Sequence, residues 1–486
     1  MPFNNELANK LAHNRILSNP VVQESLAKYK IIYDNVPTEK ELLENFVDIP
    51  LDSPRLRSIF SVDGSFDSVS VSDRFPSAQV GFIQFSMNLV KLNTNANIIK
   101  NGLVNPIEYN KITEAHTHSL DLPIFNTKIE GKDNIRDSIR FRINDYFISS
   151  RTFSDESINL LDTLYNILSE DEVRNNLNCV NEKCAREYFR DTRTSYKGNE
   201  EELNELLITK SKLNNLEKSC KCPNCGEDIL LIDYLRLHEL IDEELGSTGI
   251  LSRLSKVVEH LYPINFIMSV LENPDMQEVH KYAALSEIGF IIDGPLAIYG
   301  EPAKVNRAIH RYLNKINQEL ISRSLNPLVY IGLSKTGTIV DYISLLMTHI
   351  RDNSSEANDL LLLPKNKFML ISDDYRHKYI QPKMNDNLFG AETYYGQDIV
   401  YFNQFSQPYV LSVLYPMNRN EELFTEKIFE LGTYPNLGKI GSLINELKVD
   451  VYDSALLPIV LAHKYASISL QPGVSSLKDF ARAVLQ

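Results

Sequence analysis

Alternating apolar and polar positions predict a β-sheet near the start of the chain. Residues 81–92 place apolar side chains from Ile83 to Leu89 on one face of a strand and polar side chains on the other. Two further apolar runs, 59–62 and 288–292, are each followed directly by Asp-Gly. An aspartate so placed lies at the end of a strand, although Asp-Gly is also the strongest short signal for a hairpin turn.

The second half of the chain alternates between strand and helix patterns, which favours an α/β fold with a mixed sheet flanked by helices. The predicted helices follow Asn273, cover 304–322 and follow Asp453; the predicted strands cover 328–332, 367–371, 398–402 and 409–414. Charged helical patterns interrupt the sheet patterns. We therefore expect an N-terminal helical docking segment (1–50), a first core part (51–150), a helical insertion (151–255) and a second core part (256–486).

Composition limits the functional classes. The 50 basic and 64 acidic residues give a formal charge of −14, which argues against indiscriminate binding of nucleic acid over the whole surface. No apolar run approaches the about 18 residues of a membrane span, and the first residues lack a signal-peptide pattern. We expect a cytoplasmic protein with no membrane segment.

The five cysteines all lie between positions 179 and 225 and have the spacing of a metal site. Cys179 and Cys184 form one pair, and Cys222 and Cys225 form a Cys-Pro-x-Cys-Gly knuckle. Four thiolates leave no open coordination position, so this pattern predicts a structural Zn²⁺ within the insertion, which we interpret as a zinc ribbon. Cys220 is an alternative to Cys222 as the fourth ligand.

Carboxylates and one late histidine suggest a second metal site. Asp63 and Asp293 follow the two apolar runs, Glu278 lies on a predicted helix before the second run, and His463 lies in an apolar helix near the C-terminus. Oxygen ligands with a single nitrogen suit Mg²⁺ or Mn²⁺.

In this order, the motifs resemble those of the NurA family of prokaryotic DNA-end-processing nucleases over residues 55–95 and 270–475. The residues that carry the resemblance are Val62-Asp63-Gly64-Ser65, Glu278, Ile292-Asp293-Gly294-Pro295-Leu296, Ile331-Gly332-Leu333-Ser334-Lys335, and Leu457-Pro458 through Ala462-His463. The resemblance implies an RNase H-like core, endonuclease activity on single-stranded DNA and 5′ to 3′ exonuclease activity with Mn²⁺ or Mg²⁺. It also implies a homodimer and a HerA-type hexameric ATPase as partner.

Matched residue by residue, the resemblance implies that the metal ligands are Asp63, Glu278, Asp293 and His463. A family tyrosine is replaced by Ala455, so either Asp453 substitutes for it or the site is weaker than in the family. Glu272 and Glu287 compete with Glu278 as the helical ligand. Taken alone, a histidine on an apolar helix such as His463 is more often a hydrogen-bonded core residue than a ligand, and the resemblance is what favours its role as a ligand.

These assignments imply metal-assisted hydrolysis of a phosphodiester, with Lys335 either contacting the scissile phosphate or serving only as a surface charge. The main alternative is a non-catalytic zinc-ribbon adaptor that bridges DNA and a partner ATPase, and a second alternative is an RNA-directed nuclease. The chain has no Gly-rich phosphate loop, so an ATPase motor would have to be a partner. DNA repair and defence against phage both remain open as the cellular role.

Overall fold

The computed structural model describes residues 14, 16–29, 35–52, 56–92, 99–100, 103–104, 113–152, 157–185, 205–353, 363–382, 396–415, 423–449, 455–468 and 473–485. Within them, nine strands form one mixed sheet in the order β1-β11-β12-β13-β10-β9-β2-β3-β6. In that order the strands are β1 (Val47–Asp48), β11 (Lys367–Leu370), β12 (Gln397–Phe402), β13 (Pro408–Val413), β10 (Val329–Ser334), β9 (Ile288–Asp293), β2 (Ser58–Ser70), β3 (Gln79–Lys91) and β6 (Thr113–Phe125).

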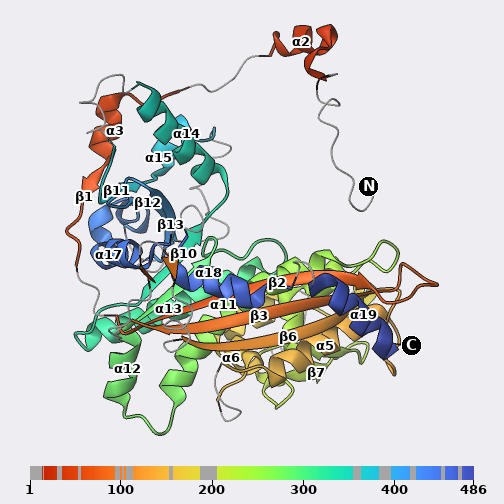
Figure 1. Ribbon diagram of the computed structural model, residues 1–486. Coiled ribbons are helices and arrows are strands. Elements are labelled where there is room, and N and C mark those ends of the chain that lie inside the picture. The colour runs from red at the N-terminus through yellow and green to blue at the C-terminus, as the bar shows by residue number, and fades with distance from the viewer. Residues whose placement is uncertain are drawn as a thin grey trace, which may run out of the picture.

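Strand directions divide this sheet into two parts. β2, β3 and β6 form an antiparallel meander, and β9 and β10 continue it on the other side of β2 as parallel strands. β13, β12, β11 and β1 extend the sheet with antiparallel pairs. The predicted α/β class with a mixed sheet flanked by helices is confirmed, and the long meander strands are seen side by side in Figure 1.

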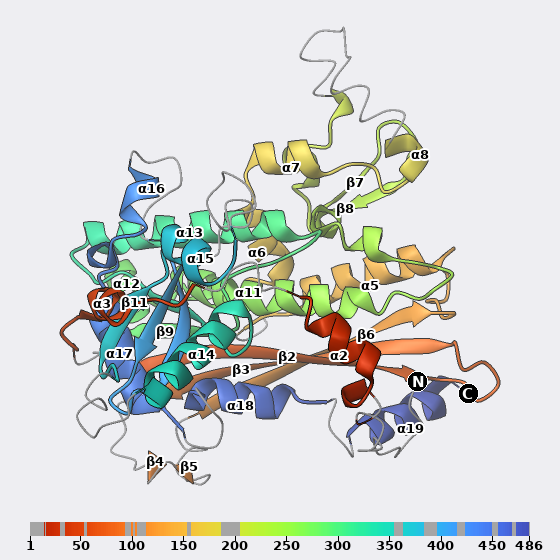
Figure 2. The ribbon, with the colours of Figure 1, turned by 90° about the horizontal axis from the view of Figure 1, so that it is seen from above.

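Helices cover both faces of the sheet (Figure 2). One face packs against α5 (Ile135–Ser149), α6 (Leu160–Ile167), α11 (Gly249–Glu272) and α13 (Ala303–Ser322), and its core includes Phe60, Val62 and Phe290. The other face packs against α17 (Leu437–Leu447) and α18 (Leu457–Ala466), and its core includes Ile59 and Ile291. Successive residues of β2 and β9 therefore point to opposite buried layers, which is why both runs are largely apolar, with Ser61 as the buried polar exception.

The remaining elements surround these layers. They are α2 (Pro20–Leu26), α3 (Glu39–Asn45), α7 (Glu170–Asn176), α8 (Glu182–Cys184), α12 (Glu278–Ser286), α14 (Thr338–Asn353), α15 (Asp373–Tyr379), α16 (Phe424–Lys427), α19 (Gly473–Leu485), the 3-10 helices η2 (Ser211–Leu213), η3 (Leu231–Leu235), η4 (Leu237–Leu240) and η6 (Leu431–Thr433), and the short strands β4 (Ile99–Lys100), β5 (Leu103–Val104), β7 (Ser219–Lys221) and β8 (Asp228–Leu230). Among the described helices, none combines the length and apolar character needed to cross a bilayer.

Some predicted boundaries differ from the structure. α12 begins at Glu278 rather than after Asn273, because residues 274–276 form a turn first. α11 runs across position 255, where we expected the insertion to end. Side chains from 160–180 and 229–241 pack into the same core as β2, β3 and β6, so the described part of the predicted insertion shares its core with the sheet.

Candidate metal centre at the strand ends

Asp63 and Asp293 lie side by side on neighbouring parallel strands. β2 pairs with β9 up to Val62 and Ile292, and each aspartate is the next residue. β9 ends there, whereas β2 continues to Ser70. The side chain of Asp63 is 7% exposed and that of Asp293 is 20% exposed. Two carboxylates held this close and largely out of water need a cation or hydrogen-bond donors to compensate for their lost hydration.

His463 reaches Asp63 from the opposite end of the sequence. Its Nδ1 lies 2.8 Å from Asp63 Oδ2, while its ring remains 60% exposed. The start of α18 is fixed to β2 by the Ser61 hydroxyl, which donates to the carbonyl oxygen of Pro458 at 3.0 Å. The end of α18 is fixed by Gln84, whose amide donates to the carbonyl of Tyr465 at 2.7 Å. The convergence of Asp63 and His463 is therefore built into the packing of α18.

Glu259 is a third carboxylate near these strand ends; it lies on α11, which packs on the opposite face of the sheet from α18, and its charge acts on Asp63. It was not predicted from the sequence. The Ser255 hydroxyl donates to its Oε1 at 2.9 Å, and the Lys256 ammonium lies 2.5 Å from its Oε2. The Glu259 side chain is 2% exposed. A methyl group at Gly64 would lie 2.8 Å from Glu259 Oε1 and 2.4 Å from Ser255 Oγ. Glycine in the first Asp-Gly is therefore required by the close approach of α11.

Two lysines neutralise this acidic group in the structure. Lys256 Nζ, besides its contact with Glu259, lies 3.5 Å from the backbone oxygen of Asp293. Lys335 directly follows β10, in which Leu333 pairs with Asp293 of β9. The Nζ atom of Lys335 lies 2.8 Å from Asp293 Oδ2. Lys335 thus stands beside a predicted ligand and is partly exposed to solvent.

Burial and crowding change the acidity of these groups. Burial, reinforced by the charge of Asp293, raises the pKa of Asp63 despite the opposing contact with His463. Burial raises the pKa of Glu259 to about 7, against the attraction of Lys256. Burial alone would lower the pKa of Lys256, but Glu259 and Asp293 raise it overall. Asp63 and Glu259 therefore both resist ionisation, and a divalent cation beside them would favour their charged forms.

Glu278 is not part of this arrangement. Its side chain is 72% exposed and forms an ion pair with Arg323 at 2.7 Å. It lies on α12, which leads into the start of β9, whereas Asp293 is at the end of that strand. The two alternatives are placed elsewhere as well: Glu287 pairs with Arg57 at 2.7 Å, and Glu272 ends α11 near the charge of Asp162. The structure thus brings Glu259 to the strand ends instead of these three.

Two predicted features of the C-terminal part have different outcomes. Asp453, the suggested substitute for the missing tyrosine, lies outside the described residues. Ala455 is described and is buried beside Val449, Leu457 and Val90. A buried alanine offers no polar group to a metal or a phosphate.

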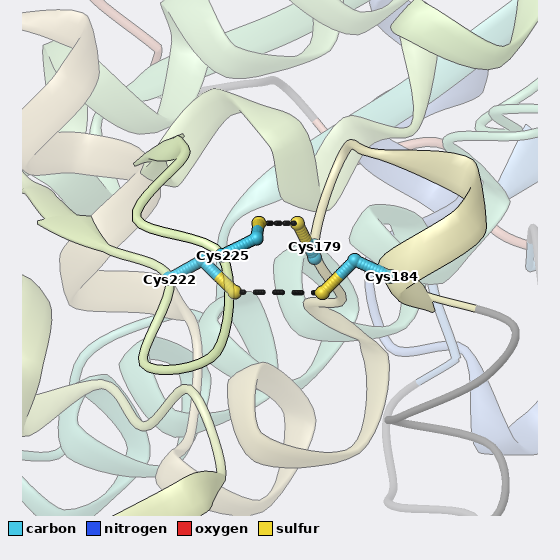
Figure 3. A group of neighbouring side chains, drawn as sticks. All are labelled: Cys179, Cys184, Cys222 and Cys225. Carbon is cyan, nitrogen blue, oxygen red and sulfur yellow. Dashed lines mark hydrogen bonds between the residues drawn. The ribbon is translucent and has the colours of Figure 1, made fainter.

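The four predicted zinc ligands converge in a separate cluster, shown in Figure 3. The sulfur atoms of Cys179, Cys184, Cys222 and Cys225 all lie within 4.8 Å of one another, and Cys220 is not among them. Cys179 and Cys225 Sγ are 3.5 Å apart, and Cys184 and Cys222 Sγ are 3.9 Å apart. The convergence of these cysteines is compatible with a tetrahedral zinc site.

Local structure explains how the cluster forms. β7 and β8 make a hairpin whose turn carries Cys222 and Cys225, and Gly226 takes the positive φ of 78° that closes it. The backbone amide of Asn181 donates to Cys179 Sγ at 3.4 Å, and the Asn224 side chain donates to Cys184 Sγ at 3.3 Å. Burial raises the pKa of Cys179 and of Cys184. A bound cation would favour their thiolate forms instead.

Comparison with known proteins finds only distant similarity. No protein-family model and no curated protein matches the chain. Among solved structures, it matches the NurA nuclease from Sulfolobus solfataricus at 9% identity with a TM-score of 0.32, covering 98% of each chain. It also matches NurA bound to dAMP and manganese at 15% identity with a TM-score of 0.29 (98% of each chain), and NurA with manganese at 12% identity with a TM-score of 0.30 (98% of this chain and 99% of that one). Since similarity at this level is too low to support conclusions about chemistry, a functional proposal has to depend on this chain's own residues.

Proposed function

We propose that this chain is a metal-dependent nuclease that hydrolyses phosphodiester bonds in DNA. The observation that supports this most directly is the adjacency of Asp63 and Asp293 on neighbouring strands at the end of β9, with His463 on Asp63 and the charge of Glu259 on α11 acting on Asp63. These three carboxylates come from three separate segments, and two of them have raised pKa values. Stability of the fold alone does not require such a group, whereas perturbed pKa values are frequent at functional sites. Carboxylate oxygens are the ligands that Mn²⁺ and Mg²⁺ prefer. No three of the ligand atoms of Asp63, Asp293, Glu259 and His463 lie within 4.8 Å of one another, so these side chains would have to move to share an ion.

In this proposal the carboxylates of Asp63, Glu259 and Asp293 hold the divalent ions. The ions supply Lewis acidity, lowering the pKa of a water and stabilising charge on the phosphate. His463 is a positioning residue in the described arrangement, because its Nδ1 fixes the orientation of the Asp63 carboxylate. It also remains a candidate ligand through its exposed ring. Lys335 pairs with Asp293 at 2.8 Å and would be available to contact the phosphate if a bound ion took its place on that carboxylate.

The four-cysteine cluster holds a structural Zn²⁺ in this proposal. The cluster joins the loop before α8 to the β7–β8 hairpin, so the ion links segments that are 38 to 46 residues apart in sequence. It lies in the predicted insertion and shares no residue with the carboxylate site. Its contribution is therefore to stability and shape, and not to bond cleavage.

The finer assignments come from the family resemblance alone. They are single-strand endonuclease and 5′ to 3′ exonuclease activity, end processing or phage defence with a HerA-type hexameric ATPase, and a homodimer; the proposed cytoplasmic location comes from the composition of the chain instead. We retain them as proposals. Co-purification with a neighbouring HerA-type ATPase and the mass of the chain in solution test the two partner assignments.

The experiment for the nuclease itself is Mn²⁺-dependent cleavage of single-stranded DNA by the native chain and by Asp63→Ala. Asp67→Ala is the matched control, because Asp67 lies four residues further along the same strand, where its carboxylate accepts a hydrogen bond from the amide of Ser68. We expect cleavage by the native chain and by Asp67→Ala, and loss of at least about 100-fold for Asp63→Ala. Equal activity in all three would refute the assignment. Parallel RNA substrates separate a DNA-directed from an RNA-directed nuclease.

The ion pairs of Lys256 and Lys335 favour one competing function, a non-catalytic adaptor. Both ammonium groups already neutralise carboxylates of the site, so the fold does not need a metal there. An adaptor would bind DNA without cutting it and would show no saturable Mn²⁺ binding that depends on Asp63. Calorimetric titration of the native chain and of Asp63→Ala with Mn²⁺ distinguishes the two.

A further inference from the structure

A polar cavity of about 440 Å³ lies beside the cysteine cluster. Its walls come from the start of α5, the loop between α7 and α8, η4 and the start of α13. This volume falls within the range of small-molecule sites and is sufficient for one nucleotide. None of the carboxylates proposed as catalytic ligands lines it, and the nuclease proposal leaves it without a role.

The lining mixes hydrogen-bond donors and acceptors. It includes the amide of Asn178, the guanidinium groups of Arg136 and Arg236, and the imidazole of His238. Two buried nitrogens, Arg136 Nε and His238 Nδ1, have no hydrogen-bond partner. Both atoms are enclosed by protein, so a ligand with acceptor atoms would reach them only after the neighbouring side chains moved.

The lining is not a simple anion trap, because its carboxylates are paired with guanidinium groups. Glu239 receives two hydrogen bonds from Arg236, at 2.7 and 2.6 Å, and Asp233 receives two from the buried Arg140, at 2.8 and 2.7 Å. Amide, guanidinium and carboxylate groups in one pocket are the set that reads the edge of a nucleobase, while the cationic groups suit a phosphate.

Basic residues connect this cavity with the proposed metal centre. Lys256 contacts Glu259 and Asp293, and Arg253 lies one turn earlier on α11. Arg253 Nε lies 3.9 Å from Glu301, and the same glutamate acts electrostatically on Arg236 in the cavity wall. Each of these cations is paired with a carboxylate, so this surface offers ammonium and guanidinium donors to a phosphate backbone only in exchange for those pairs.

We propose that the cavity binds one nucleotide of a DNA strand whose phosphodiester lies at the metal centre. This inference depends on the proposed nuclease function and adds a second contact to it, a few nucleotides from the bond that is cut. The cysteine cluster then has a physical purpose in binding, because Cys179 is itself part of the cavity wall. A strand too short to reach the cavity would be cut without benefit from it.

The test compares Arg136→Gln and Asn178→Ala with the control Arg142→Gln. Arg142 lies on the same helix as Arg136, has similar exposure and also pairs with a carboxylate, but it is outside the cavity. Binding of a fluorescent single strand of about 12 nucleotides is measured by anisotropy without added Mn²⁺. We expect about tenfold weaker binding for both cavity variants, or about 1.4 kcal/mol, and less than twofold for the control. Unchanged circular dichroism and zinc content show that the variants are folded.

A second measurement uses bis(p-nitrophenyl) phosphate, which cannot span the two sites. Its Mn²⁺-dependent hydrolysis should be the same in the cavity variants as in the native chain. Native-like binding of the oligonucleotide by both cavity variants, or equal weakening by Arg142→Gln, would overturn the inference. If dAMP displaced the oligonucleotide at a concentration close to the oligonucleotide's own Kd, the cavity would be a site for free nucleotides. The assignment of the cavity to a DNA strand would then be overturned. If no phosphodiester is hydrolysed, the nuclease proposal fails, and the binding arm still decides this inference.

Discussion

Replacing Glu259 by glutamine should abolish metal-dependent cleavage and, at the same time, stabilise the fold. Glutamine keeps the size of the side chain and an oxygen to accept the hydrogen bond from Ser255. It removes the negative charge that the proposed metal requires. Loss of the charge of a metal ligand should lower the cleavage activity at least about 100-fold. Even mutation of a residue that only hydrogen-bonds to a metal ligand lowers metal affinity or activity about 10- to 100-fold.

The stabilising effect follows from the raised pKa of about 7 for Glu259, compared with its ordinary value of 4.5. Because the folded-state pKa is the higher one, the unfolded chain loses its proton first as pH rises. Stability is therefore lost between about pH 4.5 and pH 7. A shift of this size corresponds to about 3 kcal/mol above pH 7. Glu259→Gln escapes this loss and should equal the native chain near pH 4.

Denaturant unfolding at pH 4 and pH 8, without added Mn²⁺, measures the stability, and cleavage of single-stranded DNA measures the activity. Glu278→Gln is the control, since Glu278 is exposed and pairs with Arg323 at the surface. We expect it to retain native activity and to change stability by no more than about 1 kcal/mol. The reasoning is refuted if Glu259→Gln cleaves DNA normally, or if Glu278→Gln loses activity instead.

Three further predictions concern the rest of the fold. Cys222→Ser should lose the bound zinc in atomic absorption and lower the Tm, and a native zinc content in this variant would exclude the four-cysteine site. Burial lowers the pKa of His260 to about 3 and of His310 to about 4, so the free energy of unfolding should fall as pH drops from about 6.5 to about 4. His310→Gln should make this dependence shallower in denaturant titrations, and an unchanged slope would contradict the assignment. Gly64→Ala should lose about 1–3 kcal/mol and most activity because its methyl group meets Ser255 and Glu259, whereas Gly432→Ala, which has open space, should lose neither.

The parts of the site that were predictable from sequence are those defined by local pattern. An apolar run followed by Asp-Gly specifies a strand with a carboxylate at its end, and both copies form neighbouring parallel strands. The cysteine spacing likewise specifies two short knuckles, which need only a hairpin and one loop to meet.

Glu259 was missed because its role depends on how a long helix packs across the sheet. The prediction favoured Glu278 from its position on a helix face, but a helix face does not show which end of the next strand the helix reaches. The available signal was a single carboxylate within the apolar stretch Val257-Val258-Glu259-His260-Leu261. A buried charge in such a stretch requires a partner. In the folded chain that partner is Lys256, three residues earlier on the same helix, whose Nζ lies 2.5 Å from Glu259 Oε2.

The most direct test of the metal centre is the anomalous scattering of Mn²⁺ in crystals of the native chain. We predict manganese bound by the carboxylates of Asp63, Glu259 and Asp293, with Lys256 and Lys335 displaced from their ion pairs. Manganese bound elsewhere, with both lysine contacts intact at saturating Mn²⁺, would contradict the account.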